Sequence, residues 1–235
     1  MNALLLSATK GTRLLPLTLK TPKCLLPLVN DKPMLQYWID TLLELDINKI
    51  FINIFPLKEK IISYIESLPE KIKNKIYIHN EEFLEPTGMV LSKLSLLLDN
   101  PILIIYPDTY IEKSEVKKFI ENINLCIDYP VVLGIDYIEN TRSKGKVTLD
   151  EKGIIIKFQE KPGIDKPGYF NAGIMMINNS VINFFKTEEL SNMELTLDIL
   201  PAFENKIIGI RLFNTLDIGD SLETYYQAYE RFNKK

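Results

Sequence analysis

The chain has 235 residues, of which 46% are hydrophobic and 25% charged, and its formal net charge is -3. These values are typical of a globular protein with a sizeable core, and they lack the positive charge that binding to a nucleic-acid backbone usually requires. No apolar run approaches the roughly 18 residues of a membrane span. We therefore expect a cytoplasmic protein that binds neither nucleic acid nor membrane.

Neither the first residues of the chain nor its two cysteines indicate export, a disulfide framework or a zinc site. The opening "MNALLLSA" has no basic lead and its apolar stretch is short, so we interpret it as a first strand and not as a signal peptide. Cys24 and Cys126 are far apart in the chain and have no CxxC spacing or nearby histidine. This spacing argues against a disulfide framework and against a zinc site.

In the first 135 residues, short apolar runs rich in β-branched residues alternate with segments of helical period. This alternation predicts a Rossmann-like α/β fold with a mixed, mainly parallel sheet flanked by helices. Ser114 is the expected N-cap of the last helix. Strands are expected at 2–7, 49–54, 75–79, 101–106 and 130–135, and helices at 34–46, 58–68, 88–100 and 114–125.

The pattern changes after residue 140 to shorter strands, which we expect at 145–150, 153–161 and 169–177. The first two read as a hairpin with its turn at Asp150 to Gly153. Helices near 194–204 and 220–232 flank strands around "KIIGIRLF" and "NTLDIG". Since no linker or repeat interrupts the chain, residues 1–235 are expected to form one domain with a small β excursion.

The stretch "LLLSATKGTRLLPLTLKTPKCLLPL" at residues 4 to 28 places a Gly-Thr-Arg turn directly after the first expected strand. In open α/β sheets, ligands bind beyond the carboxyl ends of strands. Gly11 allows a sharp turn with N–H groups near an anion, Arg13 can hold two phosphate oxygens, and Lys23 supplies a second cation. From the residues alone, a surface turn with solvated cations remains the alternative.

"KGTRLLPLTLKTPKCLLPLVNDKPMLQYWID" closely resembles the signature of sugar-1-phosphate nucleotidyltransferases, roughly GxGTRLxPLTxxxPKxLLPVxxKPxL, over about thirty residues. Later segments follow in family order: "IIYPDTY" and "TLDIGD" resemble the metal-binding segments, and "FQEKP" and "FNAGI" the sugar-binding ones. The closest likeness is to short mannose- or heptose-1-phosphate guanylyltransferases. The resemblance implies a GT-A-like fold, with nucleotide binding by about residues 1–135 and sugar binding by about 136–235.

These enzymes join a nucleoside triphosphate to a sugar 1-phosphate and release pyrophosphate, commonly to supply surface-glycan precursors. The resemblance implies that Arg13, Lys23 and Lys161 are catalytic and that Asp108 and Asp217 bind Mg²⁺. For each aspartate, a helix or turn cap is the alternative. The nucleotide site would comprise Leu6, Ser7, Ala8, Thr9, Gly11, Thr12, Gly88 and Asp108, and the sugar site Gly145, Glu160, Asn171, Gly173 and Glu194. A homo-oligomer is left open.

Two departures from the family pattern concern the base. Thr9 stands where most members have glycine, and its β-branched side chain disfavours a left-handed backbone. Gly88 lies in "LEPTGMV", where members have a Gly-Thr-Ala-Gly-like segment. GTP, UTP, CTP, dTTP and ATP therefore all remain open, and we prefer GTP with a mannose- or heptose-type sugar. His79, near the expected base pocket, is read as a structural histidine.

Two other functions compete with this expectation. The chain could transfer a nucleotidyl group, for example a cytidylyl group, to a non-sugar phosphate such as phosphocholine, although "FQEKP" and "FNAGI" argue against it. It could also be a nucleotide-sugar-binding homologue that has lost catalysis, as the change at Thr9 suggests. The joint presence of Arg13, Lys23, Asp108, Lys161 and Asp217 argues for the enzyme.

Overall fold

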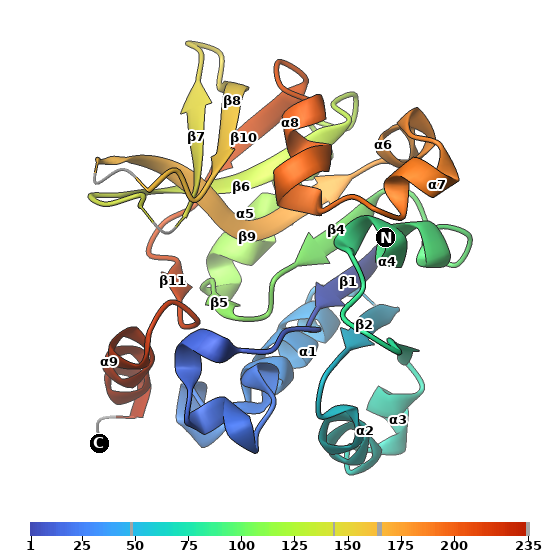
Figure 1. The fold of residues 1–235 in the computed structure, drawn as a ribbon, viewed down its shortest axis with the longest axis vertical. Helices are drawn as coiled ribbons and strands as arrows, with labels where there is room; N and C mark the ends of the chain where they lie inside the picture. Colours follow the sequence, from blue (N-terminus) through green and yellow to red (C-terminus); the bar gives the residue numbers. More distant parts are fainter. Residues whose placement is uncertain (48, 143, 164–165, 234–235) are drawn as a thin grey trace. The chain divides into compact units, whose positions relative to one another are not determined.

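The computed structural model describes residues 1–47, 49–142, 144–163 and 166–233 (Figure 1). The chain forms two compact units that are interleaved along the sequence. Unit 1 comprises residues 1–85, 105–110 and 216–235, and unit 2 comprises residues 86–104 and 111–215. The carboxyl-terminal segment therefore folds with the amino-terminal half of the chain.

Unit 1 contains three parallel strands, β1 (Asn2–Leu6), β2 (Ile50–Ile54) and β3 (Ile76–Asn80), in the order β3-β2-β1. Every residue of β1 and β2 is buried, because a parallel strand covered on both faces needs apolar side chains throughout. β3 is more exposed. The three strands confirm the expectation from the apolar runs to within one residue at each end.

The helices of unit 1 are α1 (Met34–Glu44), α2 (Lys58–Glu66), α3 (Glu70–Lys73) and α9 (Leu222–Asn233). In α1, apolar side chains three and four residues apart form one buried face that includes Leu35, Trp38 and Leu42. Residues 12–31, between β1 and α1, form short 3-10 turns. The Tyr225 hydroxyl of α9 donates to the Pro27 carbonyl at 2.8 Å, which anchors these turns to the carboxyl-terminal helix.

Two short strands complete unit 1. β5 (Thr109–Tyr110) and β11 (Leu216–Asp217) pair antiparallel, with Asp217 opposite Thr109. The Trp38 indole N–H donates to the Thr109 carbonyl at 3.1 Å, which fixes β5 to helix α1. This pairing joins residues more than a hundred positions apart in the sequence.

Unit 2 is a sheet in the order β4-β9-β6-β10-β8-β7. β6 and β10 pair parallel, whereas β9 with β6, β8 with β10 and β7 with β8 pair antiparallel. Parallel pairing is thus concentrated in unit 1, and the two units together give the mixed α/β class. The strands are β4 (Ile102–Ile105, whose last residue belongs to unit 1), β6 (Val131–Ile138), β7 (Gly145–Leu149), β8 (Ile154–Glu160), β9 (Gly168–Ile177) and β10 (Ile207–Arg211).

The expected hairpin between β7 and β8 is confirmed. Gly153 has φ +81°, and its N–H donates to the Asp150 carbonyl at 3.1 Å. The Asp150 side chain accepts from the Ile154 N–H at 2.8 Å, so the aspartate stabilises the turn through its carboxylate.

The helices of unit 2 differ from expectation at several ends. Helix α5 (Lys113–Ile123) has Glu112 as its N-cap, so the expectation that Ser114 caps it is wrong and Ser114 lies in the first turn. The helix expected at 88–100 ends at Leu94, and that at 194–204 is a π-helical turn, Leu195–Ile199, followed by α8 (Leu200–Ala202) with Pro201 near its start. The helix that ends at Leu94 is α4 (Thr87–Leu94), and the remaining helices of unit 2 are α6 (Asn179–Phe184) and α7 (Thr187–Leu190).

None of the helices formed by the described residues has the length and apolar character that crossing a membrane demands.

Candidate active site

The first loop of unit 1 follows β1 and is held by the next strand. The Ser7 N–H donates to the Asn53 side-chain oxygen at 2.7 Å, and the Thr9 N–H donates to the Phe55 carbonyl at 2.8 Å. Leu6 and Ser7 are buried, whereas Ala8 and Thr9 are half-buried. Thr9 does not adopt a positive φ, so its β-branched side chain is accommodated without a left-handed backbone.

Gly11 supplies the sharp turn that the sequence predicts. Its φ is +60°, and a Cβ there would lie 2.8 Å from the Thr18 methyl carbon, so both the backbone conformation and the available space require glycine. The Thr18 hydroxyl donates to the Gly11 carbonyl at 2.8 Å, which fixes the turn. Thr12 and Arg13 follow on the exposed side of this loop.

Lys23 and Asp108 form an ion pair. Lys23 begins the 3-10 turn Lys23–Leu25 after Pro22 and is buried, with 6% of its surface exposed. Asp108 lies between β4 and β5, and 28% of its side chain is exposed. A buried ammonium normally requires a partner, and Asp108 provides one.

Asp217 lies on β11, and Asp108 directly precedes β5, the strand that pairs with β11. The Ile218 N–H donates to the Asp108 carbonyl at 3.0 Å, and Asp217 is opposite Thr109. The Asp217 carboxylate accepts the Gly219 N–H at 2.8 Å. The two aspartates that the sequence predicts as metal ligands, 109 positions apart, are therefore brought to neighbouring positions by the β5–β11 pairing.

Gly219 and Asp220 were not singled out from the sequence. The Arg13 guanidinium forms an ion pair with the Asp220 carboxylate, Nη1 to Oδ1 2.9 Å. A Cβ on Gly219 would overlap the Lys23 ammonium and lie 3.0 Å from Asp108 Oδ2. "DIGD" contains both residues, but only the three-dimensional structure shows that Asp220 contacts Arg13 and that Gly219 leaves room for Lys23.

The residues around Lys23 suit a divalent cation. Asp108 and Asp217 offer hard carboxylate oxygens, the type of ligand that Mg²⁺ prefers, and 28% of the Asp108 side chain is exposed. Elsewhere in the described part of unit 1, a group of three possible ligands consists of His79, Glu81 and Glu85. Hydrogen bonds already link these three residues to one another.

Glu81 is at the centre of a buried network at the ends of β2 and β3. Its carboxylate accepts the Asn53 amide at 2.7 Å and the Glu85 N–H at 3.0 Å. The His79 ring contacts the Glu85 carboxylate, Nε2 to Oε2 3.0 Å. Burial raises the pKa of Glu81 above its usual range, and these hydrogen bonds only partly oppose that effect.

In unit 2, three of the expected sugar-binding residues lie together on neighbouring strands. Gly145 of β7 is opposite Glu160 of β8. A Cβ on Gly145 would be 2.9 Å from Glu160 Oε2 and 3.5 Å from the Asn171 Cβ of β9. Glycine at 145 therefore leaves the two polar side chains side by side, as a site for hydroxyl groups requires.

Lys161 and Gly173 flank this group with unusual backbone conformations. Lys161 has φ +45°, its ammonium lies 3.4 Å from Glu160 Oε1, and 58% of its side chain is exposed. Gly173 has φ +78°, and its N–H donates to Asn171 Oδ1 at 2.9 Å. The Lys161 cation is thus available to an incoming anion near Glu160.

Gly88 and Glu194 have structural contacts at the start of α4. A Cβ on Gly88 would overlap the Leu190 carbonyl, so packing against this segment requires glycine. Glu194 Oε2 accepts the Thr87 N–H at 3.3 Å and the Thr87 hydroxyl at 2.9 Å, which satisfies the first turn of the helix. Their expected contacts with base and sugar stay predictions.

A cationic loop after the first strand of a parallel sheet, in a unit that also brings Asp108 and Asp217 to neighbouring positions, is suited to binding phosphate esters. A model of the family described as nucleotidyl transferase matches residues 2–230, and this chain belongs to that family. The resemblance noted in the sequence is thereby confirmed.

Two relatives agree with this membership. The bifunctional protein GlmU of Methanocaldococcus jannaschii is 30% identical over 216 residues, which are 90% of this chain and 49% of that protein. The probable mannose-1-phosphate guanylyltransferase 3 of Oryza sativa subsp. japonica is 27% identical over 246 residues, 91% of this chain and 64% of the relative. The chain spans about half the length of the GlmU relative and less than two thirds of the rice protein.

The fold is shared with a putative glucose-1-phosphate thymidylyltransferase from Bacillus anthracis, solved in complex with a sucrose. The TM-score is 0.85 at 18% identity, over 100% of this chain and 96% of the other. At that identity the likeness shows the fold alone, and it confirms the expected GT-A-like class.

Proposed function

We propose that this protein transfers a nucleotidyl group from a nucleoside triphosphate to a sugar 1-phosphate and releases pyrophosphate. The observation that carries this proposal is the convergence of Arg13, Lys23, Asp108 and Asp217 in unit 1. Membership of the nucleotidyl transferase family supports it. The nucleotide is assigned to unit 1, and the sugar to the Gly145, Glu160 and Asn171 group of unit 2.

In the proposed reaction, an oxygen of the sugar phosphate forms a bond to the α-phosphorus, and the bond from that phosphorus to the bridging oxygen breaks. The electron pair of the broken bond leaves with pyrophosphate. The second pKa of a phosphate ester is near 6, so the attacking oxygen is already an anion at neutral pH. A general base is therefore unnecessary, and positioning and charge neutralisation are the chain's main tasks.

The cations and carboxylates of unit 1 suit these tasks. Arg13 would hold the outer phosphates of the triphosphate through its planar fork of donors, and Lys23 would neutralise charge near the reacting phosphorus. Asp108 and Asp217 would hold Mg²⁺, which when bound offsets the negative charge of the phosphates. Lys161, exposed beside Glu160, would receive the sugar phosphate.

For the base and the sugar, we favour GTP with a mannose- or heptose-type 1-phosphate. The name of the rice relative supports a guanylyl group and mannose, whereas the Bacillus structure is named for thymidylyl transfer to glucose 1-phosphate.

The test is pyrophosphate release with Mg²⁺ across five nucleoside triphosphates and a panel of hexose, heptose and amino-sugar 1-phosphates, with phosphocholine as the non-sugar acceptor. We expect the strongest release with GTP and a mannose- or heptose-type substrate, and none with Lys23→Met. Release only with phosphocholine would overturn the sugar assignment. No release in any pairing, with nucleotide binding still seen by thermal shift, would overturn the enzymatic one.

A further inference from the structure

Strand β3 has a hydrogen-bonding edge that faces away from its sheet. It is the terminal strand in the order β3-β2-β1, and the described part of the chain places no strand on its other side. The Lys75 carbonyl accepts from Ile50 at 2.9 Å and the Glu81 N–H donates to Ile54 at 3.3 Å. Since alternate residues of a strand bond to the same side, residues 76, 78 and 80 direct their N–H and C=O groups outward.

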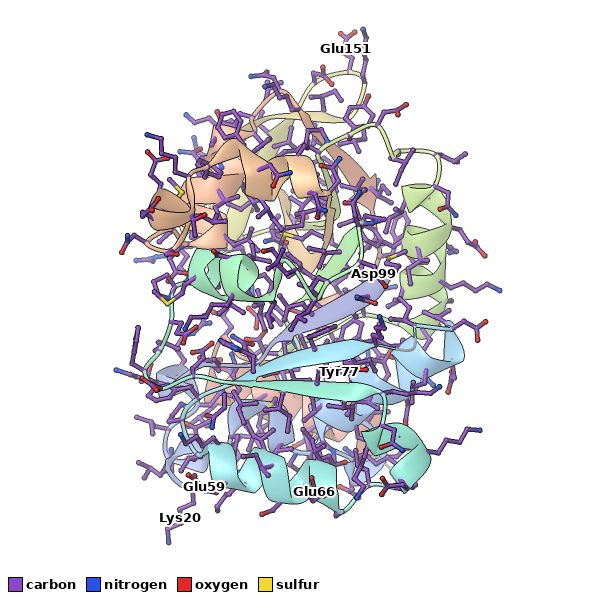
Figure 2. All side chains as sticks on the ribbon, turned by 90° about the vertical axis from the view of Figure 1, so that its right-hand side faces the viewer. Lys20, Glu59, Glu66, Tyr77, Asp99 and Glu151 are labelled. Carbon is purple, nitrogen blue, oxygen red and sulfur yellow. The ribbon has the colours of Figure 1, made fainter. Side chains whose placement is uncertain are left out.

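Apolar side chains are exposed along this edge and in the segment that follows it. Exposed fractions are 44% for Tyr77, 37% for Ile78, 52% for Phe83 and 42% for Leu84. Figure 2 shows Tyr77 on the strand that faces the viewer. These four residues lie within eight positions, whereas all residues of β1 and β2 are buried.

The features that usually protect an edge strand are missing from β3. Its sequence "IYIHN" contains no proline, lysine or glutamate, and it pairs with β2 in continuous register without a bulge. An unprotected edge with high β-propensity readily accepts another strand. The edge is therefore suited to pairing with a strand of another chain.

We propose that β3 pairs antiparallel with β3 of a second copy of this chain, about a two-fold axis at Ile78. In this register Ile78 is opposite itself, and Ile76 is opposite Asn80 of the second copy. All three outward-facing residues then form hydrogen-bonded pairs, each of which exchanges two bonds. Each copy then covers the exposed edge strand of the other, and because the contact is symmetric, the assembly stops at a dimer.

The charged residues at the two ends of β3 favour a second copy in the antiparallel orientation. Lys71, Lys73 and Lys75 precede β3, and the exposed Glu82 follows it. Lys73 also pairs with Glu66 and Glu70 of its own chain, and Glu81 and Glu85, which follow β3 too, are buried. The antiparallel arrangement sets the basic end of one copy beside the acidic end of the other, where Glu82 is exposed. A parallel arrangement would set like charges beside each other, which is unfavourable.

Symmetric cross-linking tests the register. In a Cys126→Ser background, Ile78→Cys places two thiols in one hydrogen-bonded pair, whose Cα atoms are about 5.5 Å apart and within disulfide range. Asn80→Cys is the matched control, because residue 80 is opposite residue 76 and the two residues 80 are roughly 13 Å apart. We expect near-complete disulfide dimer for Ile78→Cys and only traces for Asn80→Cys. Equal cross-linking of both variants would overturn the proposed register.

A double-mutant cycle of charge substitutions tests the interface without any introduced cysteine. Asn74 and Glu82 are both exposed and lie at opposite ends of β3 within one chain. Glu82→Lys sets lysine against the basic end of the other copy, and Asn74→Glu sets glutamate against its acidic end. We expect each single change to shift the mass measured by sedimentation equilibrium from dimer to monomer, and the double change to restore the dimer.

Leu96→Lys, at a residue that is 96% exposed in unit 2, should leave the dimer unchanged. Circular dichroism of every variant separates loss of the dimer from loss of the fold. A wild-type chain that stays monomeric at all concentrations would overturn the proposal, as would single variants that remain dimeric. Because pyrophosphate release is not the readout, the result is independent of the proposed reaction.

Discussion

Lys23 and Asp108 form an ion pair in which the cation is buried and the carboxylate is partly open. The buried lysine cannot be hydrated as a surface lysine is, and the carboxylate beside it offsets the cost of burying a cation. The open side of Asp108 leaves carboxylate oxygen accessible to a cation. In the proposed reaction, this one contact would hold both a positive and a negative group beside the nucleotide.

Gly219→Ala tests the space beside this pair. The added Cβ would overlap the Lys23 ammonium and crowd Asp108, so Lys23 must move. We expect turnover to fall about a hundredfold or more, as when one charge-stabilising group is displaced from an active site. Steady-state kinetics with the preferred substrate pair measures the effect.

Gly153→Ala is the matched control for that variant. Gly153 has φ +81° in the hairpin turn, with no neighbour closer than 3.7 Å to an added Cβ. Alanine in this left-handed conformation should lower the free energy of unfolding by about 1 kcal/mol. Turnover should stay at the wild-type level. A loss of turnover equal to that of Gly219→Ala would show that the effect is general and not local to Lys23.

Asp220→Asn should strengthen binding of the triphosphate. Asp220 pairs with Arg13, and a phosphate that uses this arginine competes with the carboxylate. The two side chains are 44% and 27% exposed, and such pairs contribute at most about 1 kcal/mol. The KM for the nucleotide should fall by up to about fivefold, with kcat nearly unchanged. A rise in KM would mean that Asp220 positions Arg13 for binding.

Asp217→Asn and Asp108→Asn should both abolish the thermal shift that Mg²⁺ produces in the presence of nucleotide. They should differ in the absence of metal. Asp108→Asn removes the charge that pairs with buried Lys23 and should lower the melting temperature, whereas Asp217→Asn should leave it nearly unchanged. Thermal denaturation with and without Mg²⁺ measures both effects. A Mg²⁺ shift retained in both variants would contradict the metal assignment.

Glu81→Gln should change how stability depends on pH. The pKa of Glu81 is raised by burial, so the folded state holds this proton more tightly than the unfolded state. Its stabilising contribution is complete below the unfolded pKa and is lost as pH rises through the folded pKa. The stability of the wild type relative to Glu81→Gln should therefore decline in urea denaturation as the pH rises above the usual pKa range of a glutamate. A relative stability that increases with pH would contradict the raised pKa.

The strands were predictable because burial on both faces leaves a continuous apolar run. β1, β2 and β4 carry such runs, and their positions agree with the sequence to within one or two residues. Helix ends were less predictable. Ser114 has the chemistry of an N-cap, yet α5 starts one residue earlier, because local propensity does not include the packing that fixes where a helix begins.

For the site, the sequence motifs named candidate residues but did not predict which of them contact one another. Asp108 and Asp217 were identified by motif, but their adjacency depends on the β5–β11 pairing. Asp220 could have been flagged only as a second acid in "DIGD", because its contact with Arg13 joins opposite ends of the chain. Gly88 read as a ligand-facing glycine, whereas the structure shows a packing requirement that involves a carbonyl about a hundred residues away.

The interleaving of the units has a consequence for biosynthesis. Unit 1 includes residues 216–235, and among the described strands β5 pairs with β11. During translation, β1, β2 and β3 can pair with one another, but the β5–β11 pairing must wait while residues 111–215 are made, because long-range pairings form late. Unit 2, contained between residues 86 and 215, can fold first. Ribosome-bound chains that end before Leu216 would therefore lack Asp217, and they should acquire Mg²⁺-dependent nucleotide binding only after that strand emerges.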